Sequence, residues 1–425
     1  MEYILGLRNR QRYVTNTNNI FENKFLSEKY DPHEILVYST SINRTLLSMT
    51  SQLQGLYPNN FKSGESLDQK QLNFSKPPMD ISCKEIDEEL VRLENSSLPN
   101  YMTMIPIHMI SEFEKKIVVF DYADRKPIVT KIIEKNEKES KDVINITNFF
   151  NEKYGKRFNK FYDRKEDFKY EFGNISKICD TFIADYIDRR NITQFFEKTN
   201  INNTNDKEEF LEECKNAIGI NFKEILYGDN EMEVLSLEES MVLKEMLHYM
   251  KIRVNTDINK EKLNISDYSK PKMVIISGHD TSLTAQILFL IKIFKLDNKI
   301  YKLPTYSAQV AIEVTRNKNN IDEKLRYSDY SVRAYFNDDL FLNVKMDEFI
   351  KTVEENIWSQ ERIDSFCYGK KNEGLKLNYY IIIIISISII VVGLLIVIII
   401  LINKIKNKNE DSNFSFDSDN LINED

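Results

Sequence analysis

Two short segments of the sequence combine residue types that bind phosphate. One is Ser39-Thr-Ser-Ile-Asn-Arg-Thr45, which contains Arg44, and the other is Ser277-Gly-His-Asp-Thr281, which contains His279 and Asp280. A guanidinium fork and an imidazole suit the oxygens of a phosphate dianion, and a neighbouring carboxyl can protonate a leaving oxygen. Taken singly, each segment is also what the start of a surface helix contains. The chemistry therefore depends on whether the two segments meet.

Each segment lies where an apolar strand is followed by a helical pattern. Residues 34–39 are mostly apolar, and a helix capped by one of residues 39–41 is expected to end at Gly55. Residues 273–276 are apolar, and a helix is expected over 283–294. In open parallel sheets, ligands bind at the carboxyl ends of the strands, where helix N-termini supply free N–H groups and a positive dipole. We therefore expect the two segments to share one pocket at this edge of a sheet.

The rest of the chain predicts an α/β fold with an inserted helical domain. The pattern is helical from about residue 145 to 249, where Ser236-x-x-Glu239 matches a capping box that would begin a helix. Strand patterns return at 308–315 and 331–335, so strand–helix units flank a helical middle. The predicted organisation is an α/β domain in two segments (1–140 and 240–365), an inserted helical cap (141–239), a juxtamembrane linker (366–380), a transmembrane helix (381–402) and a cytosolic tail (403–425).

Longer stretches around both segments resemble a known family. Residues 34–58, EILVYSTSINRTLLSMTSQLQGLYP, resemble the second signature block of the histidine acid phosphatases, and residues 273–285 resemble the His-Asp block of that family. Residues 98–108 fit a connecting strand, and residues 304–313 fit the stretch downstream. The resemblance covers roughly residues 1–350 in the same order. It implies a phosphoglycerate-mutase-like doubly wound sheet with an inserted helical cap.

The resemblance implies a role for each candidate residue. Arg44 matches the Arg that binds the transferring phosphoryl oxygens, His279 matches a His that donates to the phosphate, and Asp280 matches the general acid that protonates the leaving alcohol. In the family, a further His attacks phosphorus and forms a phosphohistidine, which water hydrolyses. No metal or cofactor is implied, because fixed cations neutralise the phosphate oxygens. The implied activity is acid phosphatase hydrolysis of phosphate monoesters.

The sequence departs from this pattern at the nucleophile. The family's nucleophilic His lies in an Arg-His-Gly-x-Arg-x-Pro string on the first strand, and no such string occurs in the 425 residues. Two phosphate-binding Arg and a central sheet strand would then also be missing. The other three His (His33, His108 and His248) are expected to be structural. The alternative reading is a non-catalytic binding or adhesion ectodomain, and a third reading keeps catalysis on a phytase-like or lipid-phosphate substrate.

The first ten residues, MEYILGLRNR, lack the apolar core of a signal peptide. Tyr3, Leu7 and Val14 follow helical spacing, which is typical of the middle of an amphipathic helix. We therefore expect Met1 to be an internal residue of a longer chain.

The composition excludes several classes of function. A net charge of −8, with 58 Lys+Arg against 66 Asp+Glu and no basic block, argues against a nucleic-acid partner. The four Cys show no CxxC spacing, and with only 4 His a zinc site is not expected. In an oxidising compartment these Cys could form two disulfides, and the sequence does not choose among the pairings of Cys83, Cys179, Cys214 and Cys367.

Residues 381–402 are an uninterrupted run of apolar and Ser residues that is long enough to span a bilayer as a helix. Lysines at 404, 406 and 408 follow the run, so the positive-inside rule predicts a type I orientation with residues 1–378 luminal or extracellular. Glycosylation is expected at some of the Asn-x-Ser/Thr sequons that precede the run, which are at Asn43, Asn73, Asn95, Asn145, Asn174, Asn191, Asn202 and Asn264.

The tail after the membrane run ends in an acidic segment with a Leu-Ile pair. Asp417 lies four residues before Leu421, and Ile422 follows, which matches the acidic dileucine pattern that cytosolic sorting adaptors bind. An acidic solubilising tail is the alternative. The pattern predicts an endosomal or lysosomal membrane location, with the cell surface as the default. Homodimer formation is left open by the sequence.

Overall fold

The computed structural model describes most of the chain. The described residues are 1–16, 25–59, 67–68, 70, 88, 91–93, 95–109, 126–187, 193–201, 204–225, 231–259, 270–298, 301–316, 325–368 and 383–402.

Helices α1 (Glu2–Tyr13) and α2 (Asn43–Leu56) pack against each other through two glycines. A Cβ at Gly6 would lie 2.0 Å from a carbonyl oxygen of α2, and a Cβ at Gly55 would lie 2.1 Å from a carbonyl oxygen of α1. Only residues without a Cβ permit this approach of two backbones. The predicted end of the helix is confirmed to within one residue, because α2 ends at Leu56. Gly55 serves the packing against α1. The predicted side-chain cap is absent, since Ile42 occupies the N-cap.

Helix α1 is attached by polar side chains. Asn9 Nδ2 donates to Gln309 Oε1 at 3.2 Å, and Arg12 Nε donates to Glu313 Oε1 at 2.7 Å. Tyr3, which the helical spacing placed on an apolar face, is 40% exposed. The predicted helix is therefore confirmed, with Val14 buried as expected, but Tyr3 does not belong to its buried face.

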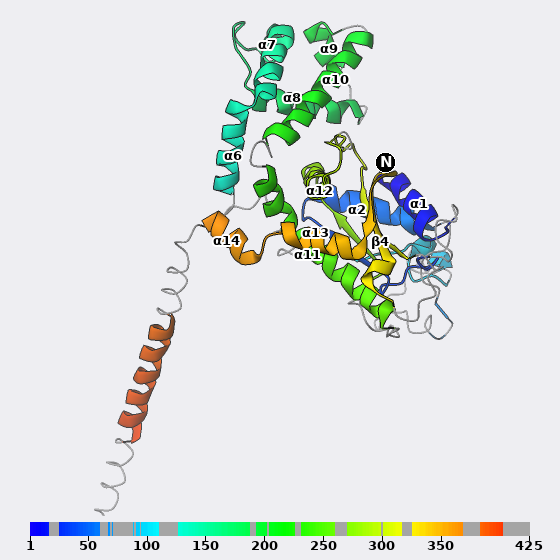
Figure 1. Ribbon diagram of the computed structural model, residues 1–425, viewed down its shortest axis with the longest axis vertical. Helices are drawn as coiled ribbons and strands as arrows, with labels where there is room; N and C mark the ends of the chain where they lie inside the picture. The colour runs from blue at the N-terminus through cyan, green and yellow to red at the C-terminus, as the bar shows by residue number, and fades with distance from the viewer. Residues whose placement is uncertain are drawn as a thin grey trace, which may run out of the picture. The chain divides into compact units, whose positions relative to one another are not determined.

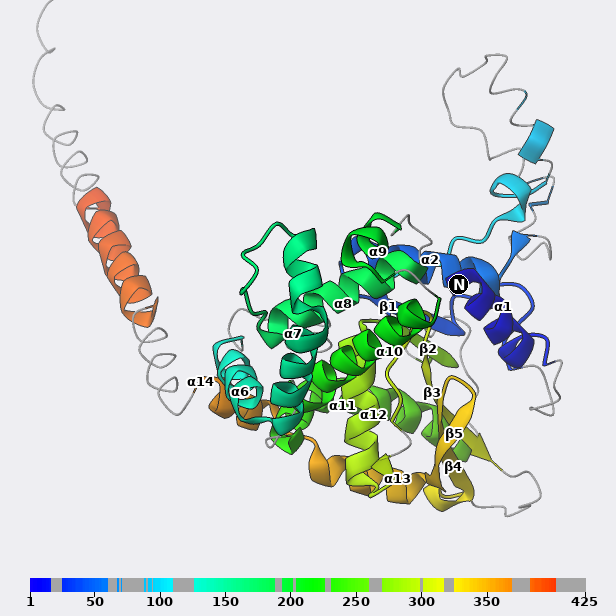
Figure 2. The ribbon, with the colours of Figure 1, turned by 90° about the horizontal axis from the view of Figure 1, so that it is seen from above.

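The strands form two sheets in the described part of the chain. Strand β1 (Ile35–Ser39) pairs in parallel with β2 (Met273–Ser277), and the register aligns the two carboxyl ends. Strands β3 (Val310–Arg316), β4 (Tyr330–Phe336) and β5 (Asp339–Lys345) form an antiparallel sheet. Figure 2 shows the strands of both sheets gathered in one region of the molecule. Strands β1 to β4 confirm the predicted strands, whereas β5 has no counterpart among the sequence predictions.

The connecting strand that residues 98–108 are expected to form is present only as one bridge among the described residues. His108 pairs in parallel with Tyr38, and its N–H donates to the Val37 carbonyl at 2.9 Å. A second apolar run at 117–120 lies outside the described residues.

Burial differs between the strands. In β4 buried and half-buried residues alternate, as expected for a strand with one face on a core. In β2 and β3 every residue is half-buried, although most are apolar. The larger core lies between β4, β5 and three helices, which are α11 (Glu231–Ile258), α12 (Asp280–Ile293) and α13 (Met346–Asn356).

The predicted capping box is wrong. Ser236 and Glu239 lie inside α11, which begins at Glu231. The Ser236 hydroxyl donates to the Asn356 carbonyl at 3.3 Å, and Glu239 is only 3% exposed. The capping-box pattern is misleading because α11 begins before Ser236, and both Ser236 and Glu239 are buried inside the protein.

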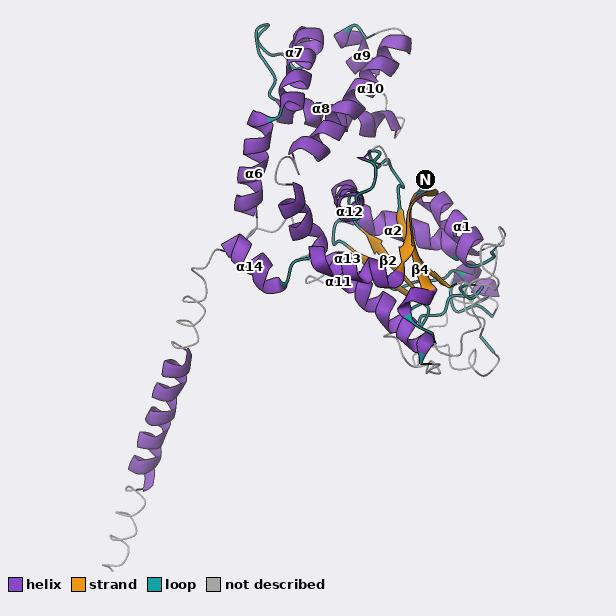
Figure 3. Cartoon of the chain, in the orientation of Figure 1, coloured by secondary structure: helices purple, strands orange, loops and turns teal. Residues whose placement is uncertain are grey.

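The inserted region is a helical cap with its own aromatic core (Figure 1). Phe182 lies 4.8 Å from Phe210 and 5.1 Å from Phe195, measured between ring centroids. Figure 3 shows only helices and loops in this part. The helices from α6 onwards are α6 (Lys126–Glu139), α7 (Lys141–Phe161), α8 (Phe172–Ile187), α9 (Thr193–Thr199) and α10 (Thr204–Ile220), followed by a π-helical turn, η4 (Asn221–Ile225). The α/β class with an inserted helical cap is thus confirmed.

Residues 360–425 form a separate compact unit. It contains α14 (Gln360–Tyr368) and an apolar helix, Ile383–Ile402, which is long and apolar enough to cross a membrane. The side chains of the apolar helix are exposed throughout. Two short 3₁₀ turns elsewhere, η2 (Pro99–Tyr101) and η7 (Tyr327–Asp329), complete the described elements.

Candidate active site

The two chemical segments meet at the carboxyl ends of β1 and β2. Arg44 lies in the first turn of α2, His279 is the N-cap residue of α12, and Asp280 is the first residue of that helix. All three line one cavity of about 2420 Å³. The structure therefore brings together the residues that the sequence placed in one pocket, while their chemical roles stay predictions.

A threonine cluster links the two strand-to-helix junctions. Thr40 Oγ1 lies 2.7 Å from Thr45 Oγ1 and 3.4 Å from His279 Nε2. Ser277 Oγ donates to the Thr45 carbonyl at 3.3 Å, and the Thr40 N–H donates to the Ser277 carbonyl at 3.3 Å. Thr40 and Thr45 are both buried, so these contacts hold the His279 ring at the edge of the cavity.

Two helix N-termini open onto the cavity, because both α2 and α12 begin at its wall. The free N–H groups and the positive end of the helix dipole favour an anion at such positions. Arg44 adds a full positive charge. The combination suits a phosphate group better than a neutral ligand.

Asp280 keeps its carboxyl available for proton transfer. Its Oδ1 accepts a hydrogen bond from the Thr281 N–H at 2.9 Å, and the residue is exposed. A carboxyl beside an anion site and open to a cavity has the position that a general acid needs.

The cap contributes a second carboxyl to the same cavity. Asp180 lies on α8 and lines the cavity with Arg44 and Asp280. Burial raises the pKa of Asp180 above its ordinary value, the neighbouring Asp280 adds to the increase, and Arg44 partly offsets it. Asp180 therefore lies on the cap side of the cavity that also holds Arg44 and Asp280.

The cavity continues along the strands. Every residue of β2 lines it, as do Arg316 and residues 310–314 of β3. No ladder joins β2 to β3 among the described residues. The uniform half-burial of both strands follows from this opening beside them.

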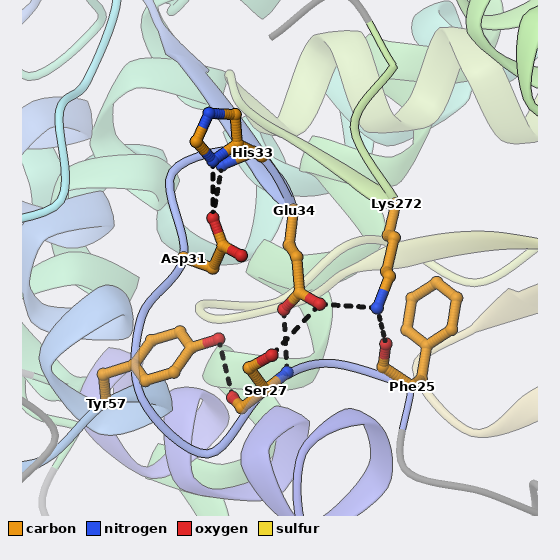
Figure 4. A network of polar contacts seen from close by, with 7 residues as sticks. All are labelled: Phe25, Ser27, Asp31, His33, Glu34, Tyr57 and Lys272. Atoms are coloured by element: carbon orange, nitrogen blue, oxygen red, sulfur yellow. Dashed lines mark hydrogen bonds and ion pairs between the residues drawn. The ribbon is translucent and has the colours of Figure 1, made fainter. Parts of the chain in front are cut away.

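The amino ends of β1 and β2 are joined instead by a polar network (Figure 4), two members of which, Phe25 and Lys272, also line the cavity. The Glu34 carboxylate accepts from the Ser27 N–H at 2.7 Å and from the Ser27 hydroxyl at 3.1 Å, and it is paired with Lys272. Lys272 Nζ also donates to the Phe25 carbonyl at 3.1 Å. Glu34 is 7% exposed, so this cluster joins the start of β1 to the start of β2 away from solvent.

None of the other three His lines the cavity. His33 Nδ1 lies 2.8 Å from Asp31 Oδ1, His108 belongs to the bridge beside β1, and His248 lies on α11 next to Tyr249. Among the described residues no group of three or more His, Cys, Asp or Glu is arranged to hold a metal ion.

The cysteines that the structure describes are buried and form no disulfide with one another. Cys179 and Cys214 lie together in the aromatic core of the cap, and Cys367 lies on α14. Cys83 is outside the described residues, so the choice of disulfide pairing stays open.

Sequence reasoning missed part of the site. Thr45 directly follows Arg44, and the pattern of hydroxyl residues around it was an available signal. Asp180 had no signal, because it lies in a cap helix, 135 residues after Thr45 and 97 residues before Ser277, and in no motif.

Comparison with known proteins adds the family. The histidine phosphatase superfamily (branch 2) matches residues 2–337. A lysosomal acid phosphatase of Xenopus laevis is 32% identical over 80 residues, so the match spans 19% of this chain and only 18% of that relative's length. The phytase of Citrobacter braakii aligns over 86% of this chain and 88% of its own, with 11% identity and a TM-score of 0.48. The phytase of Klebsiella sp ASR1 aligns over 79% of this chain and 70% of its own, with 9% identity and a TM-score of 0.42.

The family match extends over most of the chain and contains both strand-to-helix segments. It also contains the cavity wall that carries Arg44, His279 and Asp280. The chain belongs to the histidine phosphatase superfamily, branch 2.

Proposed function

We propose that the α/β region and its cap form an acid phosphatase domain that acts on phosphate monoesters. The observation that carries the proposal is the cavity wall where a guanidinium, an imidazole and a carboxyl meet at two helix N-termini. Membership in the family supports the same chemistry.

Each residue has one task in this proposal. Arg44 binds the equatorial oxygens of the transferring phosphoryl group, and His279 donates a hydrogen bond to the phosphate. Asp280 protonates the oxygen of the leaving alcohol. Because Asp280 must carry its proton to act as an acid, turnover by a complete site is expected to be greatest at acidic pH.

The attacking His is not among the 425 residues, so these residues are proposed to bind phosphate without turning over esters. Arg-His-Gly-x-Arg-x-Pro does not occur in the sequence. Loss of a nucleophile typically lowers the rate by several orders of magnitude. The cavity extends along β2 and β3, which are not paired with each other in the described part of the chain, so it offers more space than a phosphate group alone would fill.

Binding of inorganic phosphate to the full chain in detergent micelles tests the proposal. Arg44→Ala is expected to weaken binding by about tenfold or more, since a charge-assisted hydrogen bond contributes about 1.5–3 kcal/mol. Arg164→Ala is the matched control, because Arg164 is an exposed cation on the cap outside the cavity. If the wild type and Arg44→Ala bind inorganic phosphate with equal affinity, the proposed phosphate site at Arg44 is wrong.

Turnover is tested on the same preparation with p-nitrophenyl phosphate. No turnover is expected. Turnover that is lost in His279→Ala would show that a nucleophile is present after all and would overturn the binding-only part of the proposal.

The second candidate function is that of a non-catalytic binding or adhesion domain, and the absence of the nucleophile string favours it. Sequencing the transcript upstream of Met1 separates the two. An in-frame Arg-His-Gly-x-Arg and a signal peptide support the enzyme, and a stop codon without them supports the binding domain.

We further propose that the helix Ile383–Ile402 anchors the protein as a type I membrane protein with the phosphatase domain luminal. Lysines 404, 406 and 408 support this orientation. Four sequon residues (Asn43, Asn95, Asn145 and Asn174) are exposed in the structure and are accessible to glycosylation. A glycosidase-induced mass shift tests the luminal orientation, because a cytosolic domain would show none.

The Leu421-Ile422 pair is proposed to direct the protein to endosomes or lysosomes. Replacing both residues with Ala is expected to move a tagged full-length protein to the plasma membrane. An unchanged distribution would contradict the sorting role and leave the orientation unaffected.

A further inference from the structure

The cap places one carboxyl in electrostatic reach of the phosphate site. Asp180 of α8 lines the cavity, and both Arg44 and Asp280 contribute to its electrostatic environment. Asp180 keeps access to solvent through the open cavity, so it is not committed to the cap core. It is therefore placed to meet a ligand rather than to stabilise a helix.

The position of Asp180 decides which part of a substrate it meets. A phosphoryl group held by Arg44 and His279 directs its ester oxygen to Asp280, the general acid of the proposed function. The rest of the substrate must then lie in the part of the cavity outside this pocket, which the cap helix α8 lines with Asp180. We take Asp180 to meet the leaving alcohol, because it lines the same cavity as the general acid Asp280 and its charge is affected more strongly by Asp280 than by Arg44.

A carboxylate at this place discriminates by charge. It repels a leaving group that carries a further anion and attracts one that carries an ammonium group, and like-charge juxtaposition is an effective means of rejecting ligands. The attraction is strengthened where neighbouring groups exclude part of the solvent.

Two lysines on the cap side of the cavity are paired with acids, whereas Asp142 on α7 is a second cap acid that lines it. Lys215 Nζ lies 2.6 Å from Glu212 Oε1, and Lys223 Nζ lies 3.4 Å from Glu224 Oε1. Lys177, one turn before Asp180 on α8, also lines the cavity and would favour the opposite charge. Asp180 is the acidic cap residue whose charge interacts with Arg44 and Asp280, which favours it over Lys177 as the selecting group.

We propose that Asp180 is a specificity-determining residue that selects phosphate monoesters with a cationic amine near the ester oxygen. This inference rests on the proposed function, because it takes the phosphoryl position from Arg44 and His279.

Calorimetric binding of two size-matched ligands to the full chain in micelles tests the inference. O-phosphoethanolamine carries an ammonium group two carbons from the ester oxygen, and phosphoglycolate carries a carboxylate there. The wild type is expected to bind phosphoethanolamine about tenfold more tightly, as one partly desolvated ion pair together with one relieved repulsion would produce. Asp180→Asn is expected to reduce this ratio to about twofold or less.

The matched control is Asp167→Asn, an exposed cap acid outside the cavity, which should keep the wild-type ratio. Retained affinity for inorganic phosphate shows that each variant is folded and that the phosphate site is intact. An unchanged ratio in Asp180→Asn overturns the inference. A wild-type preference for phosphoglycolate that disappears in Lys177→Gln also overturns it, in favour of an anionic leaving group.

The failure of the proposed function looks different. If inorganic phosphate does not bind to the wild type, the phosphate site itself is absent. If phosphate binds and only the ratio of the two esters fails to respond, the selecting role of Asp180 alone is wrong.

Discussion

The two ends of the β1–β2 pair carry similar polar groups in opposite environments. At the amino end, Glu34 is 7% exposed and is bonded to Ser27 and Lys272. At the carboxyl end, Arg44 and Asp280 are exposed and His279 is half-buried. A satisfied buried network rigidifies a fold, whereas charged groups that remain open to a cavity can take a ligand. Burial and complete hydrogen bonding, rather than residue type, distinguish the structural network around Glu34 from the candidate site.

The first prediction uses α2, which carries Arg44 in its first turn and Gly55 in its last. Gly55→Ala is expected to destabilise the fold by at least about 3 kcal/mol, because the new Cβ would lie 2.1 Å from a backbone oxygen of α1 and the helices must separate. Chemical denaturation of the full chain measures the loss.

Gly155→Ala is the matched control. Gly155 also lies inside a helix, but a Cβ there would meet its nearest neighbour at 3.8 Å. Ala should therefore be tolerated and should stabilise the fold by about 0.5 kcal/mol. Equal effects at the two glycines would contradict the close helix crossing.

The second prediction concerns Glu239, a third acid that is buried like Glu34 but lacks its network. Glu239 Oε2 has no hydrogen-bond partner, and burial raises the pKa of Glu239 to about 8. Below the ordinary value of 4.5 the carboxyl is neutral in both states, so it affects stability little. Between pH 4.5 and 8 the unfolded chain releases the proton while the folded chain keeps it, so stability falls as pH rises.

Glu239→Gln removes this pH-dependent loss. The variant is expected to be more stable than the wild type by about 3 kcal/mol at pH 7 and similar to it at pH 4. Denaturation at the two pH values checks the sign. A gain that is the same at both pH values would show that proton binding by Glu239 is not its cause.

The third prediction concerns the polar network at the amino ends of β1 and β2. Lys272→Ala leaves the Glu34 carboxylate buried with only the Ser27 donors, which should destabilise the fold by about 2 kcal/mol because a buried charge loses its partner. Lys302→Ala is the control, since the Lys302–Asp339 pair is exposed and should change stability by less than about 0.5 kcal/mol. Phosphate affinity per folded molecule should be unchanged in both variants.

The parts of the molecule that the sequence predicted are those with local signals. The apolar runs before Arg44 and His279 and the helical patterns after them are visible within about twenty residues. Parallel pairing then brings the two carboxyl ends together without further information. Strands β1 and β2 and the shared cavity wall follow from these signals.

The remaining features depend on contacts between distant residues. Glu34 and Lys272 are 238 residues apart, and no local pattern links the two. The closely packed glycines Gly6 and Gly55 are equally invisible in either helix alone. At Ser236 the local signal is misleading, because tertiary packing extends α11 through an apparent start. Asp180 belongs to the site only through the tertiary packing of the cap, which no local pattern predicts.

The last prediction lies between the two environments and has the smallest effect. Thr40 is 2% exposed, so it is buried like the network at the amino end of the strands, yet its hydroxyl contacts His279 at their carboxyl end. Thr40→Val keeps the shape of the side chain and removes its bonds to Thr45 Oγ1 and His279 Nε2. We expect a loss of about 1 kcal/mol in stability. We also expect phosphate affinity to fall about threefold, because the His279 ring loses one of the contacts that orient it. Thr50→Val, at an exposed position of α2, should change neither quantity. A stability loss with unaltered phosphate affinity would place Thr40 with the structural cluster and show that the ring is held by its other neighbours.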